Sequence, residues 1–199
     1  FPGQFKHIAK KIADAGHDTK FLCQTHYGRK LNGVNRVTLK NKSGHEYLEK
    51  NCKNINDRAQ MLGLQYRSAF IELKKALWEP DIVISHSGWG CGLYVKEIWP
   101  SSRLISYLEW WFNPTSEFFS YDESNKSLNI NKSSITKSWQ RNQQIALELS
   151  VSDNLVSPTN WQKDQLPPIF RKKCEVVFDG IELEKFNSSL RKPDKSKFT

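Results

Sequence analysis

His86 stands where an apolar run meets a glycine-rich segment. The run at residues 82–84, Ile-Val-Ile, is typical of a strand buried on both faces, and the glycines at 88, 90 and 92 indicate a loop after it. In open α/β sheets ligands bind at this edge of the sheet. An imidazole placed there can exchange a hydrogen bond with a ligand, or it can close the strand end through a backbone hydrogen bond. The spacing alone leaves both interpretations open.

Glu109 is the second candidate for chemistry, because it directly follows an apolar run at residues 104–108. If that run is the next parallel strand, Glu109 emerges at the same sheet edge as His86. A carboxylate in that place can act as a base, although a single glutamate at a strand end is often only solvated. The aromatic residues 110–112 that follow it are more typical of a core than of a ligand platform.

The elements that must position these residues are predicted from hydrophobic periodicity and from turn residues. The predicted helices cover residues 5–12, 55–78, 92–99 and 135–149, with a further helix that starts at Thr159 and has capping-box spacing to Gln162. The predicted strands cover residues 19–25, 34–39, 82–85, 104–108, 155–156 and 175–178. Residues 41–44 are predicted to form a turn, and residues 113–131 are irregular.

The alternation of strands and helices predicts an α/β fold, with a Rossmann-like doubly wound, mostly parallel sheet and helices on both of its faces. We expect this domain to cover residues 1–186, followed by a charged tail or the start of a linker at residues 187–199. The chain opens with a loop and a helix, as if a first strand were missing. Since that strand normally lies in the middle of such a sheet, we expect either a polypeptide that starts before Phe1 or a rearranged sheet.

Composition limits the possible partners. The 199 residues carry a formal charge of +9, which favours an anionic partner such as a phosphorylated small molecule, nucleic acid or a membrane surface. The sequence contains no helix-turn-helix, RNA-recognition or zinc motif, so we expect no specific nucleic-acid binding. The four widely spaced cysteines indicate reduced thiols in a cytoplasmic protein. No stretch has the roughly 20 apolar residues needed to cross a bilayer, so any membrane contact would be peripheral.

Five segments, in this order, resemble the N-terminal domain of bacterial family 4 glycosyltransferases of the two-domain GT-B type. They are FPGQFKHIAKKIADAGHD, PDIVISHSGWGCGLYVKEIWP, LISYLEWWF, SPTNWQKDQLP and EVVFDGIELEKF. The resemblance implies a retaining enzyme that transfers a sugar from a nucleotide-diphosphate donor to a glycan or lipid-linked acceptor, without an obligatory metal or other cofactor. It also implies a C-terminal domain for the donor nucleotide, which is not in this sequence, so we expect the chain to be inactive alone.

The resemblance assigns roles by position. His86 would lie beside the transferred sugar. The role of Glu109 comes instead from its place at the strand end, where it could bind an acceptor hydroxyl or act as its base. For the donor we expect Gly3, Gln4, Gly88, Trp89 and Gly90, and for the acceptor Trp110, Thr159 and Gln162. Of these, Gly3, Thr159 and Gln162 match family positions, and the others are candidates from residue type and place. Local structure offers another explanation for most of them: turns that need positive φ for the glycines, packing for Trp89, and helix capping for Thr159 and Gln162.

Two further interpretations stay open. The chain could be a non-catalytic or differently functioning Rossmann-like nucleotide-binding domain, although SGWGCG fits the dinucleotide-binding fingerprint poorly. Lys6, Lys10 and Lys11 of the first predicted helix could attract an anionic acceptor or the inner face of a membrane, or they could simply form a solvated helix face.

Overall fold

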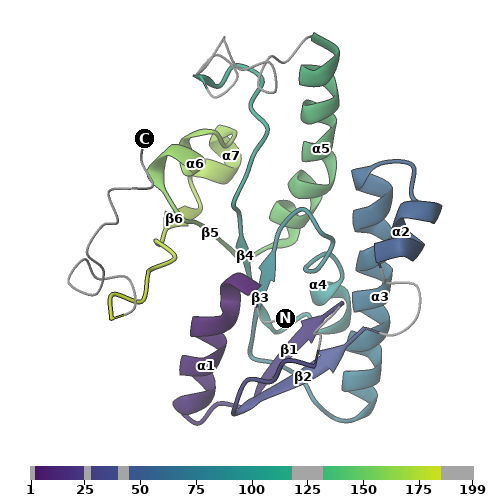
Figure 1. Ribbon diagram of the computed structural model, residues 1–199, viewed down its shortest axis with the longest axis vertical. Helices are drawn as coiled ribbons and strands as arrows, with labels where there is room; N and C mark the ends of the chain where they lie inside the picture. Colours follow the sequence, from purple (N-terminus) through teal and green to yellow (C-terminus); the bar gives the residue numbers. More distant parts are fainter. Residues whose placement is uncertain (1–2, 25–27, 40–44, 118–131, 185–199) are drawn as a thin grey trace, which may run out of the picture.

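The computed structural model describes residues 3–24, 28–39, 45–117 and 132–184. The strands are β1 (Thr19–Cys23), β2 (Val34–Thr38), β3 (Ile82–His86), β4 (Arg103–Tyr107), β5 (Asn154–Ser157) and β6 (Cys174–Val176). The helices are the 3₁₀ turn η1 (Gly3–Phe5) and α1 (Lys6–Asp14), α2 (His45–Asn51), α3 (Ile55–Lys75), α4 (Val95–Ile98), α5 (Lys132–Val151), α6 (Asn160–Asp164) and α7 (Pro168–Arg171). Figure 1 shows their arrangement.

All of the strand pairs are parallel, which confirms the predicted α/β class. The strands are divided between two sheets, one with the order β1-β2 and one with the order β3-β4-β5-β6. Within the described residues, β1 pairs only with β2, and β3 pairs only with β4. The division falls between β1 and β3, so the described strands form two parallel sheets where a single sheet was expected.

The predicted strand-helix-strand unit around the glycine loop is confirmed, because β3 and β4 are parallel neighbours with His86 opposite Tyr107. Its helix is shorter than predicted. Residues 87–94 form turns, in which Leu93 donates its N–H to the carbonyl of Gly90 and Val95 donates to that of Gly92. The helix begins only at Val95, because the hydrogen bonds of the segment before it join residues three apart, as in turns, and not four apart as in an α-helix.

Other boundaries agree to within a few residues, and two short helices were missed. The missed helices are α2 and α7, each of at most two turns, which is too short to show a clear hydrophobic period. The predicted turn at residues 41–44 and most of the predicted irregular segment at 113–131 lie outside the described residues.

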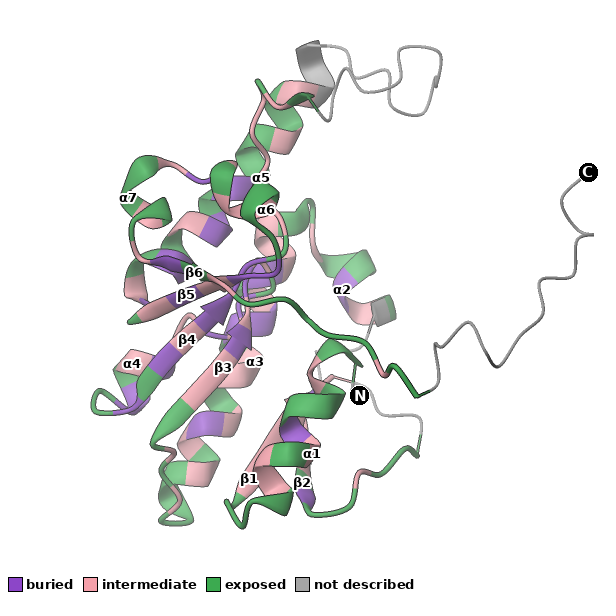
Figure 2. Cartoon of the chain, turned by 90° about the vertical axis from the view of Figure 1, so that its left-hand side faces the viewer, coloured by how far each residue is buried: buried purple, intermediate pink, exposed green. Residues whose placement is uncertain are grey.

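Two apolar clusters hold the elements together. One joins α5, α7, β5 and β6 around Leu149, Leu155 and Leu166, the last of which lies between α6 and α7. The other packs α3 and α4 against β3 and β4 around Phe70 and the fully buried Trp99, and it also receives Leu22 of β1. Figure 2 shows buried residues concentrated along β4 and β5.

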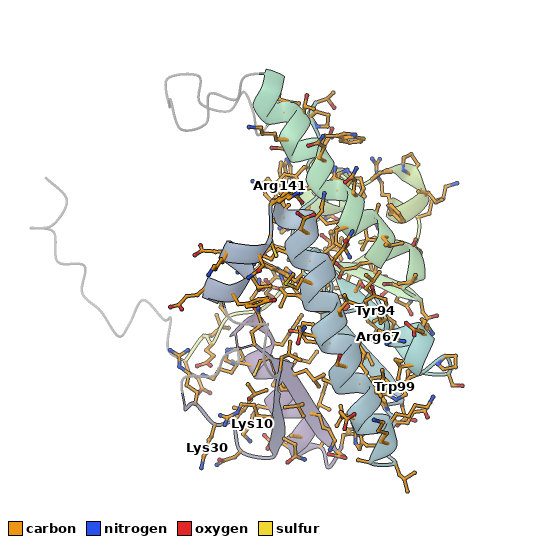
Figure 3. All side chains as sticks on the ribbon, turned by 90° about the vertical axis from the view of Figure 1, so that its right-hand side faces the viewer. Lys10, Lys30, Arg67, Tyr94, Trp99 and Arg141 are labelled. Carbon is orange, nitrogen blue, oxygen red and sulfur yellow. The ribbon has the colours of Figure 1, made fainter. Side chains whose placement is uncertain are left out.

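Polar contacts bind α3 to its neighbours. The guanidinium of Arg67 forms an ion pair with Glu97 of α4 and lies 5.9 Å from the ring centroid of Tyr94, and Figure 3 shows Arg67 and Tyr94 side by side. Asn56 donates from its side chain to the carbonyl of Gln140 in α5, at 3.0 Å. These contacts fix α3 beside both α4 and α5, and the segment that follows His86 packs against α3 and α5.

Candidate active site

His86 is the last residue of β3, and hydrogen-bond acceptors lie opposite both of its ring nitrogens. Nδ1 is 3.0 Å from the carbonyl oxygen of Ser87, and Nε2 is 3.3 Å from Oε2 of Glu109. A carbonyl oxygen only accepts, so Nδ1 carries a proton in the first contact, and both contacts are hydrogen bonds only when both nitrogens are protonated. The side chain is 21% exposed. The imidazole is therefore oriented by the protein and still reachable from solvent.

Aromatic rings form the wall behind His86. Its ring centroid lies 6.3 Å from that of Phe5 and 5.4 Å from that of Tyr107, and the rings of Phe5 and Tyr107 meet edge to face at 5.7 Å. Phe5 belongs to η1, so the turn that opens the chain is brought against the carboxyl ends of β3 and β4 (Figure 1). The wall gives the imidazole an apolar side and leaves its Nε2 edge toward Glu109.

Glu109 joins three segments of the chain at this edge. Its Oε1 accepts a hydrogen bond from Nε2 of Gln4 at 3.1 Å, while its Oε2 faces His86. Its backbone carbonyl accepts from Nε2 of Gln162 at 2.8 Å. The expected meeting of His86 and Glu109 at one sheet edge is thus found, and the side chain of Glu109 is 48% exposed and open to a ligand.

Thr159 and Gln162 form the start of α6 beside this pair. The Thr159 hydroxyl accepts from the N–H of Gln162 at 3.2 Å and donates to its side-chain oxygen at 2.7 Å. Helix capping therefore accounts for Thr159, as its spacing predicted. Gln162 has a second function, because its amide nitrogen links α6 to Glu109. The acceptor-binding role of both residues stays a prediction.

The glycines of the loop contact the protein interior. Gly88 and Gly90 both have positive φ, and their N–H groups donate to Oε1 of Glu148 at 3.1 and 2.8 Å. A Cβ at Gly90 would lie 2.0 Å from the carbonyl oxygen of Ala59, so only glycine fits there. Turn conformation and close packing thus explain both residues, and their predicted contact with a donor remains untested. At Gly3, also at positive φ, a Cβ would have no described atom within 4 Å.

The candidate tryptophans lie in different surroundings. Trp89 is 41% exposed, and its ring lies 5.9 Å from the guanidinium of Arg58 on α3. Trp110 pairs with Trp161 of α6 at 5.5 Å between ring centroids, next to the Glu109 carbonyl contact. Trp111 belongs to the core. The Trp110–Trp161 pair lies next to the site, because Trp110 directly follows Glu109 and Trp161 directly precedes Gln162.

Sequence reasoning missed three residues of this site: Phe5, Tyr107 and Asp179. The Tyr107 hydroxyl donates to both carboxylate oxygens of Asp179, at 2.8 and 2.9 Å. Burial, and then this hydrogen bond, raise the pKa of Tyr107 well above its usual value. The segment after β6 is thereby fastened beside His86, and His7 of α1 contacts Glu182 of the same segment at 3.2 Å. The Asp179-Gly180 dipeptide could have drawn attention to Asp179, but the sequence does not show that Tyr107 is its hydrogen-bond partner.

Some kinds of site are not found in the part of the chain that the structure covers. Among residues 3–24, 28–39, 45–117 and 132–184, no group of three His, Cys, Asp or Glu side chains could hold a metal ion. Over the same ranges no helix combines the length and the apolar character that a membrane span needs. The four cysteines, all of which lie in described segments, are free thiols.

The fold and the site define an α/β domain of parallel strands, with polar side chains gathered at their carboxyl ends. The sequence profile of the glycosyl transferase family 4 group matches residues 15–186. A match over most of the chain shows that this protein belongs to the glycosyl transferase family 4 group, and it confirms the resemblance seen in the sequence. The chain is thus a glycosyltransferase domain. A search among curated proteins found no match.

Proposed function

We propose that this chain is the acceptor-side half of a retaining glycosyltransferase, which transfers a sugar from a nucleotide-diphosphate donor to a glycan or lipid-linked acceptor. The observation that carries the proposal is the pairing of His86 with Glu109. Gln4 and Gln162, from two other segments, also donate hydrogen bonds to Glu109. Two titratable side chains held this way at the ligand-binding edge of a parallel sheet can contact sugar hydroxyls.

The roles follow from the contacts. His86, oriented through Nδ1 by the Ser87 carbonyl, presents Nε2 to a hydroxyl of the transferred sugar. Glu109 accepts a hydrogen bond from the acceptor hydroxyl. In the transfer step the acceptor oxygen bonds to the anomeric carbon, the bond from that carbon to the diphosphate breaks, and the acceptor proton passes to the departing phosphate. Oriented dipoles beside the sugar stabilise its oxocarbenium-like charge.

The donor diphosphate is proposed to be held between this chain and a second, C-terminal domain, without a metal ion. On this side we assign Gly3 and Gln4, because Gly3 leaves open space for a close approach and Gln4 already contacts Glu109. The acceptor is assigned to Trp110 and Gln162, beside the exposed face of Glu109. We assign the lysines of α1 to contact with an anionic acceptor or a membrane surface, although Lys10 forms an ion pair with Asp14.

The test uses the complete polypeptide with its donor domain, assayed for release of nucleoside diphosphate from a panel of UDP- and GDP-hexoses with glycan acceptors. His86→Ala is expected to keep the fold and to lower kcat about 100-fold, as for other single dipoles that act on the transition state. His17→Ala, an exposed histidine distant in sequence from the site, is the matched control. Near-normal turnover of His86→Ala would remove His86 from the mechanism. Nucleotide binding without transfer for any donor would favour a non-catalytic nucleotide-binding domain.

A further inference from the structure

Glu148 is a carboxylate that the proposed mechanism does not use, and it lies directly behind the glycine loop. It belongs to α5 and its side chain is fully buried. Its Oε1 accepts hydrogen bonds from the N–H groups of Gly88 and Gly90 at 3.1 and 2.8 Å, and Nε2 of Gln144 lies 3.4 Å away. A buried carboxylate is costly, so these charge-assisted bonds must compensate for lost hydration.

The contact matters because it fixes backbone amides of a loop that no strand ladder holds. Residues 87–94 lie outside the strand ladder, and Ser87 is tied to β4 through its N–H and hydroxyl, which donate to the carbonyl of Tyr107 at 2.9 and 3.1 Å. Beyond Ser87, the positive φ values of Gly88 and Gly90 turn both amides inward to the same oxygen atom. This is the arrangement by which successive backbone N–H groups hold an anion. Here the anion is supplied by the protein.

We propose that Glu148 is a positioning residue of the transfer site. Its ionised carboxylate holds the glycine loop, and through the loop it holds the Ser87 carbonyl that orients His86. Protonation of the carboxylate loosens this hold. The role in transfer rests on the proposed function, whereas the hold on the loop does not. The link to His86 is short, because Ser87 both accepts from Nδ1 of His86 and precedes the two clamped glycines.

The surroundings of Glu148 place its ionisation near neutral pH. Burial raises its pKa to about 7, and the hydrogen bonds from the loop and from Gln144 offset part of that rise. Its second oxygen, Oε2, has no hydrogen-bond partner among the described residues. Among the described residues, Tyr66 from α3 and Cys91 from the loop interact electrostatically with Glu148, and burial raises the pKa of both. Both are therefore neutral at pH 7, and they supply no positive charge to keep Glu148 ionised.

The first experiment follows the backbone amides of Gly88 and Gly90 by two-dimensional ¹H–¹⁵N NMR between pH 5.5 and 8.5. Since histidines in general titrate in this range, the series is recorded in a His86→Ala background. We expect both amide protons to move together, with one midpoint near pH 7, as the carboxylate ionises. Glu148→Gln is expected to abolish that transition, while Glu79→Gln, an exposed glutamate before β3, is expected to keep it. A transition that persists in Glu148→Gln, or none in its parent, would overturn the proposal.

A second measurement covers the case in which Glu148→Gln does not fold. In protein labelled with ¹³C at the glutamate side-chain carboxyl, a buried resonance titrating with the same midpoint as the Gly90 amide supports the clamp, and different midpoints refute it. In the complete enzyme, Glu148→Gln is expected to lower kcat about 10-fold with little change in the acceptor KM, and to remove a limb of the pH profile near 7. If Glu148→Gln leaves kcat and the pH profile unchanged in an enzyme that loses activity with His86→Ala, the positioning role of Glu148 is rejected, while the proposed function stands.

Discussion

At the residue scale, the site depends on side chains that are held by backbone groups. His86 is oriented by the carbonyl of Ser87, Glu109 receives Gln162 on its own carbonyl, and Glu148 binds two loop amides. Backbone groups of a strand end or tight loop are fixed by the fold, so they orient side chains at little further entropic cost. The most exposed of the three side chains is Glu109, which suits it to exchange a protein partner for a ligand hydroxyl.

A hydroxyl on β4 anchors the segment that closes one side of the site. Tyr107→Phe keeps the ring beside Phe5 and His86 and removes only the donor to Asp179. We expect the free energy of unfolding to fall by about 1–2 kcal/mol, because a hydrogen bond to a carboxyl group is lost but Asp179 can return to water. Urea unfolding measures the change. Tyr94→Phe is the control, since the Tyr94 hydroxyl has no hydrogen bond with the described residues; equal losses in both variants would contradict the anchoring role.

At the element scale, the loop between β3 and α4 is fitted between two helices. On one side Gly90 packs against the backbone of α3 at Ala59, and a Cβ at Gly63 would lie 3.2 Å from the Gly90 carbonyl oxygen. On the other side, Glu148 of α5 accepts from the loop amides. The loop conformation therefore depends on α3 and α5 together, which Asn56 ties to each other.

This packing makes Gly90 intolerant of any side chain. Gly90→Ala would place a Cβ 2.0 Å from the Ala59 oxygen and at positive φ, so we expect a loss of more than about 3 kcal/mol in unfolding free energy. Gly16→Ala shares the positive φ but has no described atom within 4 Å of the added carbon, and we expect it to cost only about 1–2 kcal/mol. Thermal and urea unfolding of both variants give the comparison. Similar losses would show that backbone conformation, and not the contact with α3, limits this position.

At the scale of the whole molecule, one apolar cluster joins the two sheets. Leu22 of β1 packs into the cluster of Phe70 and Trp99, and the Trp78 indole donates to Asp18, just before β1, at 2.6 Å. Side-chain packing in this cluster therefore connects β1 to the four-stranded sheet, although β1 and β3 are not paired within the described residues. The site lies on the four-stranded sheet, and the two-stranded sheet supports it through α1 and the turn η1 that carries Gln4 and Phe5.

Global stability should also register the buried charge of Glu148. Its pKa in the folded chain, about 7, is above the ordinary value of 4.5, so between these pH values the folded state binds more protons than the unfolded state. The free energy of unfolding therefore falls by about 3 kcal/mol on account of Glu148 as the pH rises from about 4.5 to 7. Glu148→Gln should remove this loss, so that its stability relative to the parent chain is higher at pH 8 than at pH 5. Urea unfolding at both pH values measures the difference, and Glu79→Gln should show none. Parallel pH dependences of parent and Glu148→Gln would refute the assignment.

Much of this protein could be predicted from the order of its residues: the main elements, the strand-loop-helix around His86, the edge at which Glu109 emerges, and the family. These features follow from local rules, namely side-chain periodicity, the φ range of glycine and the common direction of parallel strands. The helix that starts after Thr159 is an instance, because a capping hydrogen bond spans only three residues.

The groups that meet across long separations became visible only in the folded chain. Glu148 lies 58 residues from Gly90 and Asp179 lies 72 from Tyr107, and neither contact has a local signature. Each depends on where α5 crosses behind the loop and where the chain runs after β6. The division of the strands into two sheets has the same origin, since strand pairing joins segments that are far apart in the sequence.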